Sequence, residues 1–82
     1  MLVNVYRSPR KDLTYIYLPR DTKLDTLPAP LRQQFGEPEL VLTLNLTSDR
    51  KLARYSGEHV LSEIEHRGYF LQMPPSEKEE VC

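Results

Sequence analysis

The sequence predicts a single small α+β domain, with one sheet of about four strands and two helices packed on it. Two kinds of apolar pattern carry this prediction. Some segments place apolar residues at every second position, and others place them at every third or fourth position. The chain has 82 residues, a length that allows one domain. The expected order of elements is β-β-α-β-α-β, without an internal repeat.

The first two strands are expected at residues 2–7 and 14–18. In the first segment Val3 and Val5 alternate with other side chains, which is the period of a strand with one buried face. The second segment is rich in β-branched and aromatic residues. A short polar stretch with a turn-favouring Pro9 separates the two segments, so we expect an antiparallel hairpin.

The first helix is expected to have an apolar stripe at i, i+4 and i+8, formed by Leu27, Leu31 and Phe35. Asp25 and Thr26 are the N-cap candidates because their side chains can accept a hydrogen bond from a free amide. Pro28 and Pro30 fit only in the first turn, where no intrahelical amide donor is lost. Gly36 is typical of the position that ends a helix.

The third strand, at residues 39–46, is the clearest strand prediction in the chain. Apolar and polar or β-branched side chains alternate strictly along it. The alternation places four leucines on one face: Leu40, Leu42, Leu44 and Leu46.

The second helix is expected between a capping Ser56 and a terminating Gly68. Its apolar positions are Val60, Leu61 and Ile64. Glu63 and Arg67 stand at i and i+4, in the order that favours an ion pair. The last strand, residues 69–73, is followed by two prolines, which cannot donate to a sheet ladder.

The apolar faces of these elements define the expected core. It consists of Val3, Val5, Ile16, Leu18, Leu31, Phe35, Leu42, Leu44, Val60, Leu61, Ile64 and Leu71. A domain of this length has a stability margin of only a few kcal/mol. An unpaired charge in the core, as in Leu44→Asp, is therefore expected to unfold it.

The domain is expected to span residues 1–75 and to be followed by an acidic, disordered tail at residues 76–82. Cys82 is the single cysteine and cannot form an internal disulfide, which fits a reducing cytoplasm. No apolar run approaches the roughly 18 residues that a membrane span requires. The alternating first residues are also unlike a signal peptide. We therefore expect a cytoplasmic domain without a membrane partner.

Several stretches are similar to a known family. They are Tyr6-Arg7-Ser8 with Tyr15-Ile16-Tyr17, then Phe35-Gly36-Glu37-Pro38, and finally Gly68-Tyr69-Phe70-Leu71-Gln72-Met73-Pro74-Pro75. In this order they resemble the YcgL domain family of small bacterial proteins, over about residues 2–75. The resemblance implies a compact α/β domain in the bacterial cytoplasm. It implies no reaction and supplies no catalytic residues.

The strongest candidate for a binding surface is the first hairpin. Arg7, Arg10 and Lys11 lie within five positions of one another. Tyr15 and Tyr17 are two residues apart on the following strand, so both point to one face of the sheet. If only the other face is covered, the two rings stay partly exposed beside the three cations.

The charge distribution supports the choice of this region. Residues 1–34 carry six basic and three acidic side chains, and the remainder carries five basic and nine acidic ones. The formal net charge of −1 is therefore divided into +3 and −4. Such a division favours binding to an acidic surface by the first part of the chain.

Three hypotheses follow. The first is a non-enzymatic module that binds an unknown protein partner through the basic hairpin, with electrostatic complementarity selecting the partner. The alternative is a weak binder of RNA or single-stranded DNA, in which the cations bind phosphates and the rings stack on bases. A general nucleic-acid binder is usually basic overall, and this chain is not. The third is a plain solvated loop with no ligand, in which the tyrosines pack within the fold.

A less favoured hypothesis is a small hydrolase. His59, Glu63 and His66 share an outward helix face, and both residue types bind zinc. The two histidines are about 10.5 Å apart along the helix axis, however, too far for one metal ion. The sequence has no nucleophile motif and no glycine-rich phosphate loop. We therefore predict no catalytic residue, no metal site and no cofactor.

Overall fold

The computed structural model describes residues 1–52 and 55–73. The elements are β1 (Leu2–Arg7), β2 (Tyr15–Pro19), a 3-10 turn η1 (Leu24–Thr26), α1 (Ala29–Phe35), β3 (Glu39–Asn45), α2 (Gly57–Arg67) and β4 (Phe70–Gln72). The predicted order β-β-α-β-α-β is confirmed. The expected domain end at residue 75, the acidic tail and Cys82 lie outside the described residues.

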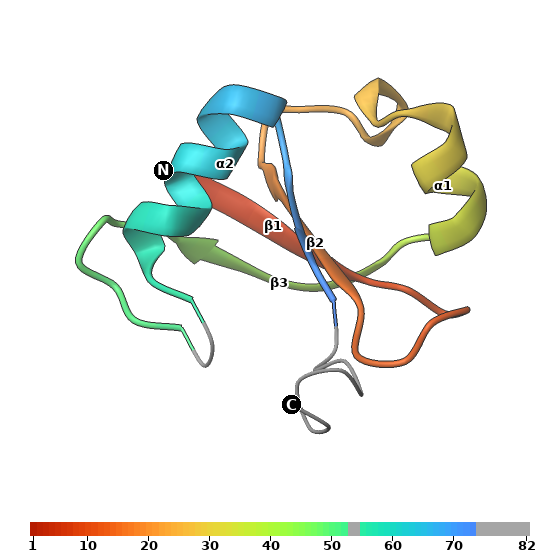
Figure 1. The fold of residues 1–82 in the computed structure, drawn as a ribbon, viewed down its shortest axis with the longest axis horizontal. Coiled ribbons are helices and arrows are strands. Elements are labelled where there is room, and N and C mark those ends of the chain that lie inside the picture. Colours follow the sequence, from red (N-terminus) through yellow and green to blue (C-terminus); the bar gives the residue numbers. More distant parts are fainter. Residues whose placement is uncertain (53–54, 74–82) are drawn as a thin grey trace, which may run out of the picture.

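The four strands form one sheet in the order β3-β1-β2-β4, and all neighbours are antiparallel (Figure 1). β1 and β2 form the predicted hairpin and occupy the centre of the sheet. β3 and β4 lie at opposite edges, so the connection through α2 crosses the whole sheet. The sheet thus has a long edge strand of seven residues and a short one of three.

The two helices cover opposite faces of the sheet (Figure 1). The cluster beneath α2 contains Val3, Val5, Tyr17, Leu46, Val60, Ile64 and Phe70. The cluster beneath η1 and α1 contains Ile16, Leu18, Leu27 and Phe35. Successive residues of β2 enter the two clusters alternately, so the central strand is buried on both sides.

The second helix begins and ends as the sequence predicts. The Ser56 hydroxyl accepts a hydrogen bond from the His59 amide at 3.1 Å, and Gly68 adopts the left-handed conformation with φ 90°. The Glu63–Arg67 ion pair is present at 3.3 Å. These local signals are correct because they depend only on residues within one or two turns.

The prediction of the N-cap of α1 is wrong. Asp25 and Thr26 belong to η1, and the N-cap residue is Pro28, which makes no side-chain capping bond. The Thr26 hydroxyl instead donates to the Lys23 carbonyl at 2.7 Å. Leu27 is extended, with ψ 148°, because a residue that precedes proline avoids the helical region. The α-helix therefore begins two residues later than expected.

The core prediction fails at β3. Leu42 is 44% exposed, whereas Leu46, just beyond the strand, is fully buried. The pairing with β1 shifts between Val5 and Tyr6, and Val41 has no partner in the register. This bulge moves Leu40 to the face opposite Leu42, so the four leucines do not share one face as predicted. Leu42 is exposed because no helix of the described residues contacts β3 as α2 contacts β2 and β4. The other expected core residues are buried or half-buried.

Candidate interaction surface at the hairpin loop

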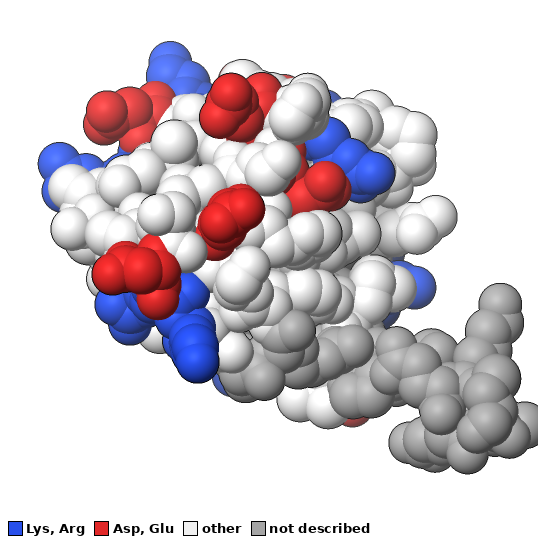
Figure 2. Space-filling model, turned by 60° about the vertical axis from the view of Figure 1, so that its left-hand side comes forward, with Lys and Arg blue, Asp and Glu red and all other residues white. Residues whose placement is uncertain are grey.

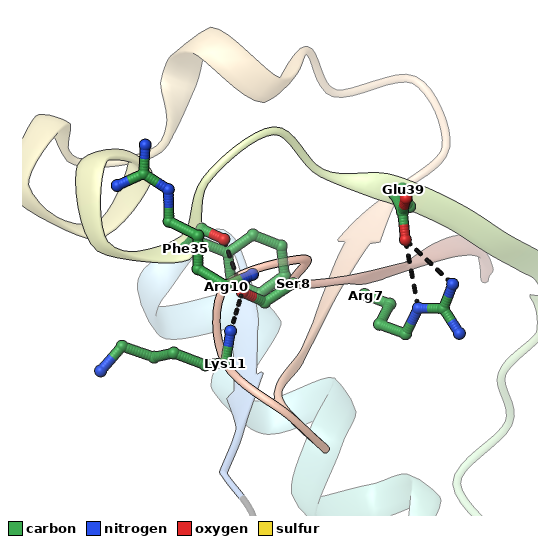
Figure 3. Close-up of polar contacts among 6 residues, drawn as sticks. All are labelled: Arg7, Ser8, Arg10, Lys11, Phe35 and Glu39. Carbon is green, nitrogen blue, oxygen red and sulfur yellow. Dashed lines mark hydrogen bonds and ion pairs between the residues drawn. The ribbon is translucent and has the colours of Figure 1, made fainter.

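The loop between β1 and β2, residues 8–14 and here called the hairpin loop, is organised around one buried hydroxyl. Ser8 Oγ accepts hydrogen bonds from the amides of Arg10 at 3.2 Å and Lys11 at 3.0 Å. It donates to the Phe35 carbonyl at 2.5 Å (Figure 3). The Ser8 amide in turn donates to the Thr14 carbonyl at 3.0 Å. The loop is therefore anchored to the end of α1, and its backbone is fixed.

Arg10 is held against α1 by a second set of contacts. Its guanidinium Nη1 donates to the Gln33 carbonyl at 3.2 Å. Its aliphatic stem lies over Gly36, where an added Cβ would stand 2.9 Å from the Arg10 Cγ. Gly36 also has φ 84°, which favours glycine. Gly36 therefore has two functions: it ends α1 and it leaves room for the Arg10 side chain.

The three cations of the hairpin do not converge. Arg7 pairs with Glu39 of β3, with Nη2 2.9 Å from Oε1. Figure 3 shows Arg7 pointing to the β3 side, whereas Arg10 and Lys11 extend to the α1 side. Among residues 1–52 and 55–73, no acidic side chain pairs with either Arg10 or Lys11. Arg10 and Lys11 therefore lie on the same side of the loop but line different hollows, and Arg7 is separated from both.

The two tyrosines point to the face that α2 covers, but they are buried to different degrees. Tyr17 is only 8% exposed, packs edge-on against Phe70, and donates its hydroxyl to Gln72 Oε1 at 3.0 Å. Burial, and then the neighbouring Tyr15 and Tyr55, raise the pKa of the Tyr17 phenol. Tyr15 is half-buried. Tyr15 is therefore the more accessible ring of the pair.

Within the described residues, three hollows border the hairpin loop, the smallest of which, about 80 Å³, is lined by Lys11, Thr14 and residues of α1 and β4. The other two are larger. The one on the α1 side has a volume of about 430 Å³, and its lining includes Arg10, Arg32, Asp25, Glu37, Leu24 and Leu27. The one on the β3 side has a volume of about 580 Å³, and its lining includes Arg7, Pro9, Asp12, Leu13, Tyr15 and Glu39. In the first of these larger hollows, Asp25 and Glu37 accompany the two arginines, and Leu24 and Leu27 make part of its wall apolar. In the second, the carboxylates of Asp12 and Glu39 outnumber the one arginine.

Leu13 is the unusual residue of the loop. It is exposed, and its φ of 57° lies in the left-handed region that non-glycine residues seldom adopt. It follows Asp12 and leads into β2, so this conformation closes the turn. Sequence reasoning missed both Leu13 and Ser8. A serine followed by proline after a strand is a signal of a side-chain-stabilised turn and would have indicated Ser8.

The exposed face of α2 carries the other predicted group. The His59 ring stacks on Tyr55 with centroids 5.6 Å apart, and His66 Nδ1 lies 2.7 Å from the Ser62 carbonyl oxygen. Within the described parts of the chain, no three His, Cys, Asp or Glu residues are grouped as metal ligands.

On the side of the molecule seen in Figure 2, acidic side chains are spread across the surface. No described helix is long and apolar enough to cross a bilayer.

The comparisons with known proteins assign the family. The model of the YcgL domain matches residues 3–75. This chain belongs to the YcgL domain family. A YcgL domain-containing protein of Saccharophagus degradans is 49% identical over 75 residues, which cover 92% of this chain and 82% of the relative. One from Thioalkalivibrio sulfidiphilus is 51% identical over 75 residues, covering 92% and 93%. One from Hydrogenovibrio crunogenus is 44% identical over 81 residues, covering 99% and 84%.

Proposed function

We propose that this YcgL domain is a non-enzymatic protein-interaction module that binds an acidic segment of a partner through the hairpin loop. The observation that carries the proposal is the fixed position of Arg10. Its stem lies on Gly36, its guanidinium is bonded to the Gln33 carbonyl, and it remains exposed at the rim of a hollow. A cation that is already positioned loses little conformational entropy when it binds a carboxylate.

The neighbouring residues support an acidic and partly apolar ligand. Lys11 extends to the same side as Arg10 (Figure 3) but borders a separate, smaller hollow. Arg32 lines the hollow of Arg10 together with Asp25 and Glu37. Leu24 and Leu27 give the hollow apolar walls. An acidic peptide with one apolar side chain fits this combination, because its carboxylates would meet Arg10 and Lys11, to which no described carboxylate is paired, while the apolar group enters the hollow.

The rest of the predicted surface has a smaller part in this proposal. Arg7 is already paired with Glu39, so a ligand would have to compete for it. Tyr17 is buried beneath α2 and is not available to a ligand. Tyr15 lines the hollow on the β3 side of the loop, where a ligand can contact it. The burial of Tyr17 also weakens the nucleic-acid alternative, which needs two rings available for stacking.

The experiment is affinity capture from a bacterial lysate with three baits. They are the wild type, Arg10→Glu/Lys11→Glu, and the charge-matched control Arg20→Glu/Lys23→Glu, whose residues are exposed outside the loop. We expect a protein that survives nuclease treatment, is retained by the wild type and the control, and is reduced about tenfold by the loop variant.

Two outcomes would contradict the proposal. Equal capture by all three baits would show that the hairpin loop is solvent-exposed and binds no partner. Capture of nucleic acid that disappears on nuclease treatment, with affinity for oligouridine falling steeply with salt, would support the alternative instead. Circular dichroism of each bait establishes that the variants are folded.

A further inference from the structure

Within residues 1–52 and 55–73, the long edge strand β3 has three consecutive exposed apolar side chains. Leu40, Val41 and Leu42 are 58%, 47% and 44% exposed. Leu42 is paired with Val5, on the α2 face, and Leu40 with Tyr6, on the α1 face. Apolar side chains are therefore exposed on both faces of the same strand. α2 packs mainly against β2 and β4, and no helix makes comparable contact with β3 within the described residues.

β3 lacks most of the devices that usually prevent an edge strand from pairing. Between Leu40 and Leu46 there is no charged residue and no proline. The only ionisable side chain of the strand is Glu39, at its first position, where it pairs with Arg7. The bulge at Val41 is the one protective feature present. A strand edge also presents unpaired backbone amides and carbonyls, which can bond to a further strand.

We propose that the chain forms a two-fold symmetric homodimer by antiparallel pairing of the β3 edges of two copies. A strand that pairs with this edge needs a free edge of its own, and it buries the exposed apolar side chains best if it is uncharged opposite residues 40–45. β3 of a second copy meets both conditions. The pairing would join the two four-stranded sheets into one, with the two α2 helices on the same side.

The charges of β3 favour the antiparallel arrangement. A two-fold axis at Leu42 or Thr43 places each Glu39 opposite Asn45 or Thr47 of the second copy, so that no like charges meet. Parallel pairing would place the two Glu39 carboxylates beside each other. The two Leu42 side chains lie on the same face and become direct or diagonal neighbours across the axis. The opposite edge, β4, has only three residues, so the contact closes as a dimer instead of growing into a filament.

The test is the molar mass in solution, measured by sedimentation equilibrium from about 10 µM to about 1 mM, a range that detects even weak association. The monomer mass is 9.6 kDa, and the dimer has twice this mass. We expect the wild type to approach the dimer mass as its concentration rises. Leu42→Lys and Leu42→Glu should each remain monomeric, because like charges would meet near the axis.

An equimolar mixture of Leu42→Lys and Leu42→Glu provides the decisive measurement. The opposite charges attract, so the mixture should regain the dimer mass that each variant alone has lost. Met73→Lys is the matched control, since Met73 has a similar exposure of 47% and follows β4 at the other edge. It should dimerise like the wild type.

Three outcomes would overturn the proposal. The first is a wild type that stays at 9.6 kDa throughout the concentration range. The second is a dimer that persists in both Leu42 variants, which would place the interface elsewhere. The third is a monomeric wild type whose β3 amides become protected from hydrogen exchange only in the presence of a foreign peptide, which would identify a different occupant of the edge.

Discussion

The central strand β2 and the edge strand β3 are both apolar, yet their burial differs completely. Three consecutive residues of β2, from Ile16 to Leu18, are buried, while six of the seven residues of β3 are exposed. β3 has the more regular apolar pattern of the two in the sequence. The comparison shows that an alternating pattern predicts a strand, whereas the position of the strand in the sheet determines how much of it is covered.

The two strands differ in burial because the helices cover different parts of the sheet. α2 covers one face of the β2 side of the sheet, and η1 with α1 covers the other. β3 is joined to the core mainly at its end, where Leu46 is buried and Leu44 half-buried. Among the described residues, the middle of the strand is attached to the domain mainly through β1, by the backbone pairing and by the hydrogen bond from the Thr43 hydroxyl to Asn4 Oδ1.

The largest expected effect comes from placing the same charge in each strand. Ile16→Asp should abolish folding, because a carboxylate without a partner inside the apolar cluster beneath η1 and α1 costs more than the about 3–5 kcal/mol available to such a small domain. Leu42→Asp should lower the free energy of unfolding by less than about 1 kcal/mol, because its side chain stays in water.

The measurement is urea denaturation followed by circular dichroism, at a concentration low enough to keep the chain monomeric. If Leu42→Asp is as damaging as Ile16→Asp, the middle of β3 is covered in the monomer and the comparison is wrong.

A smaller effect is expected where the segment after β3 meets α2. A Cβ on Gly57 would stand 1.9 Å from the Thr47 carbonyl oxygen, so the backbone must move. Gly57→Ala should therefore lower the free energy of unfolding by about 3 kcal/mol. Gly68→Ala, at the other end of α2, meets no neighbour and should cost only about 1 kcal/mol through its φ of 90°.

Thermal unfolding of the two alanine variants separates these effects. Equal losses of stability in the two variants would mean that the backbone at Thr47 can move at little cost in free energy. The segment after β3 would then contribute little to holding the strand against the rest of the domain.

The smallest expected effect is a change in the free energy of unfolding at alkaline pH, caused by Tyr17 of β2. The folded state raises the pKa of Tyr17 above its ordinary value of 10.0, mainly by burial. The unfolded chain therefore loses this proton first as the pH rises, and the free energy of unfolding falls above about pH 10. Below pH 10 the contribution of this group is fully present.

Tyr17→Phe should remove this component of the alkaline decline and cost about 1 kcal/mol at neutral pH through the lost bond to Gln72. Melting temperatures from about pH 8 to about pH 11 test it. An unchanged alkaline slope in the variant would show that Tyr17 is not the responsible group.

Most of the fold could be predicted from the sequence because its signals are local. The strands and helices occur within one or two residues of the expected bounds, and Ser56 and Gly68 limit α2 as predicted. The N-cap of α1 failed because proline chemistry at Leu27 overrode the capping preference of Asp25 and Thr26.

The candidate site was predictable in composition but not in geometry. The sequence placed Arg7, Arg10 and Lys11 in one loop, yet the pairing of Arg7 with Glu39 connects residues 32 positions apart. The bond from Ser8 to the Phe35 carbonyl and the support of Arg10 by Gly36 likewise join β1, the hairpin loop and α1. Such contacts depend on how the elements pack, which no local pattern encodes.

The sequence by itself determined the elements, their order, the family and the cations of the hairpin loop, because each depends on neighbouring residues or on recognisable stretches of the chain. Only the tertiary structure decided that α2 covers Tyr17, that Arg7 turns away from Arg10, and that Leu40 and Leu42 of β3 face water. The physical reason is that period-two alternation is the same in central and edge strands, whereas burial depends on which elements lie above and below each strand.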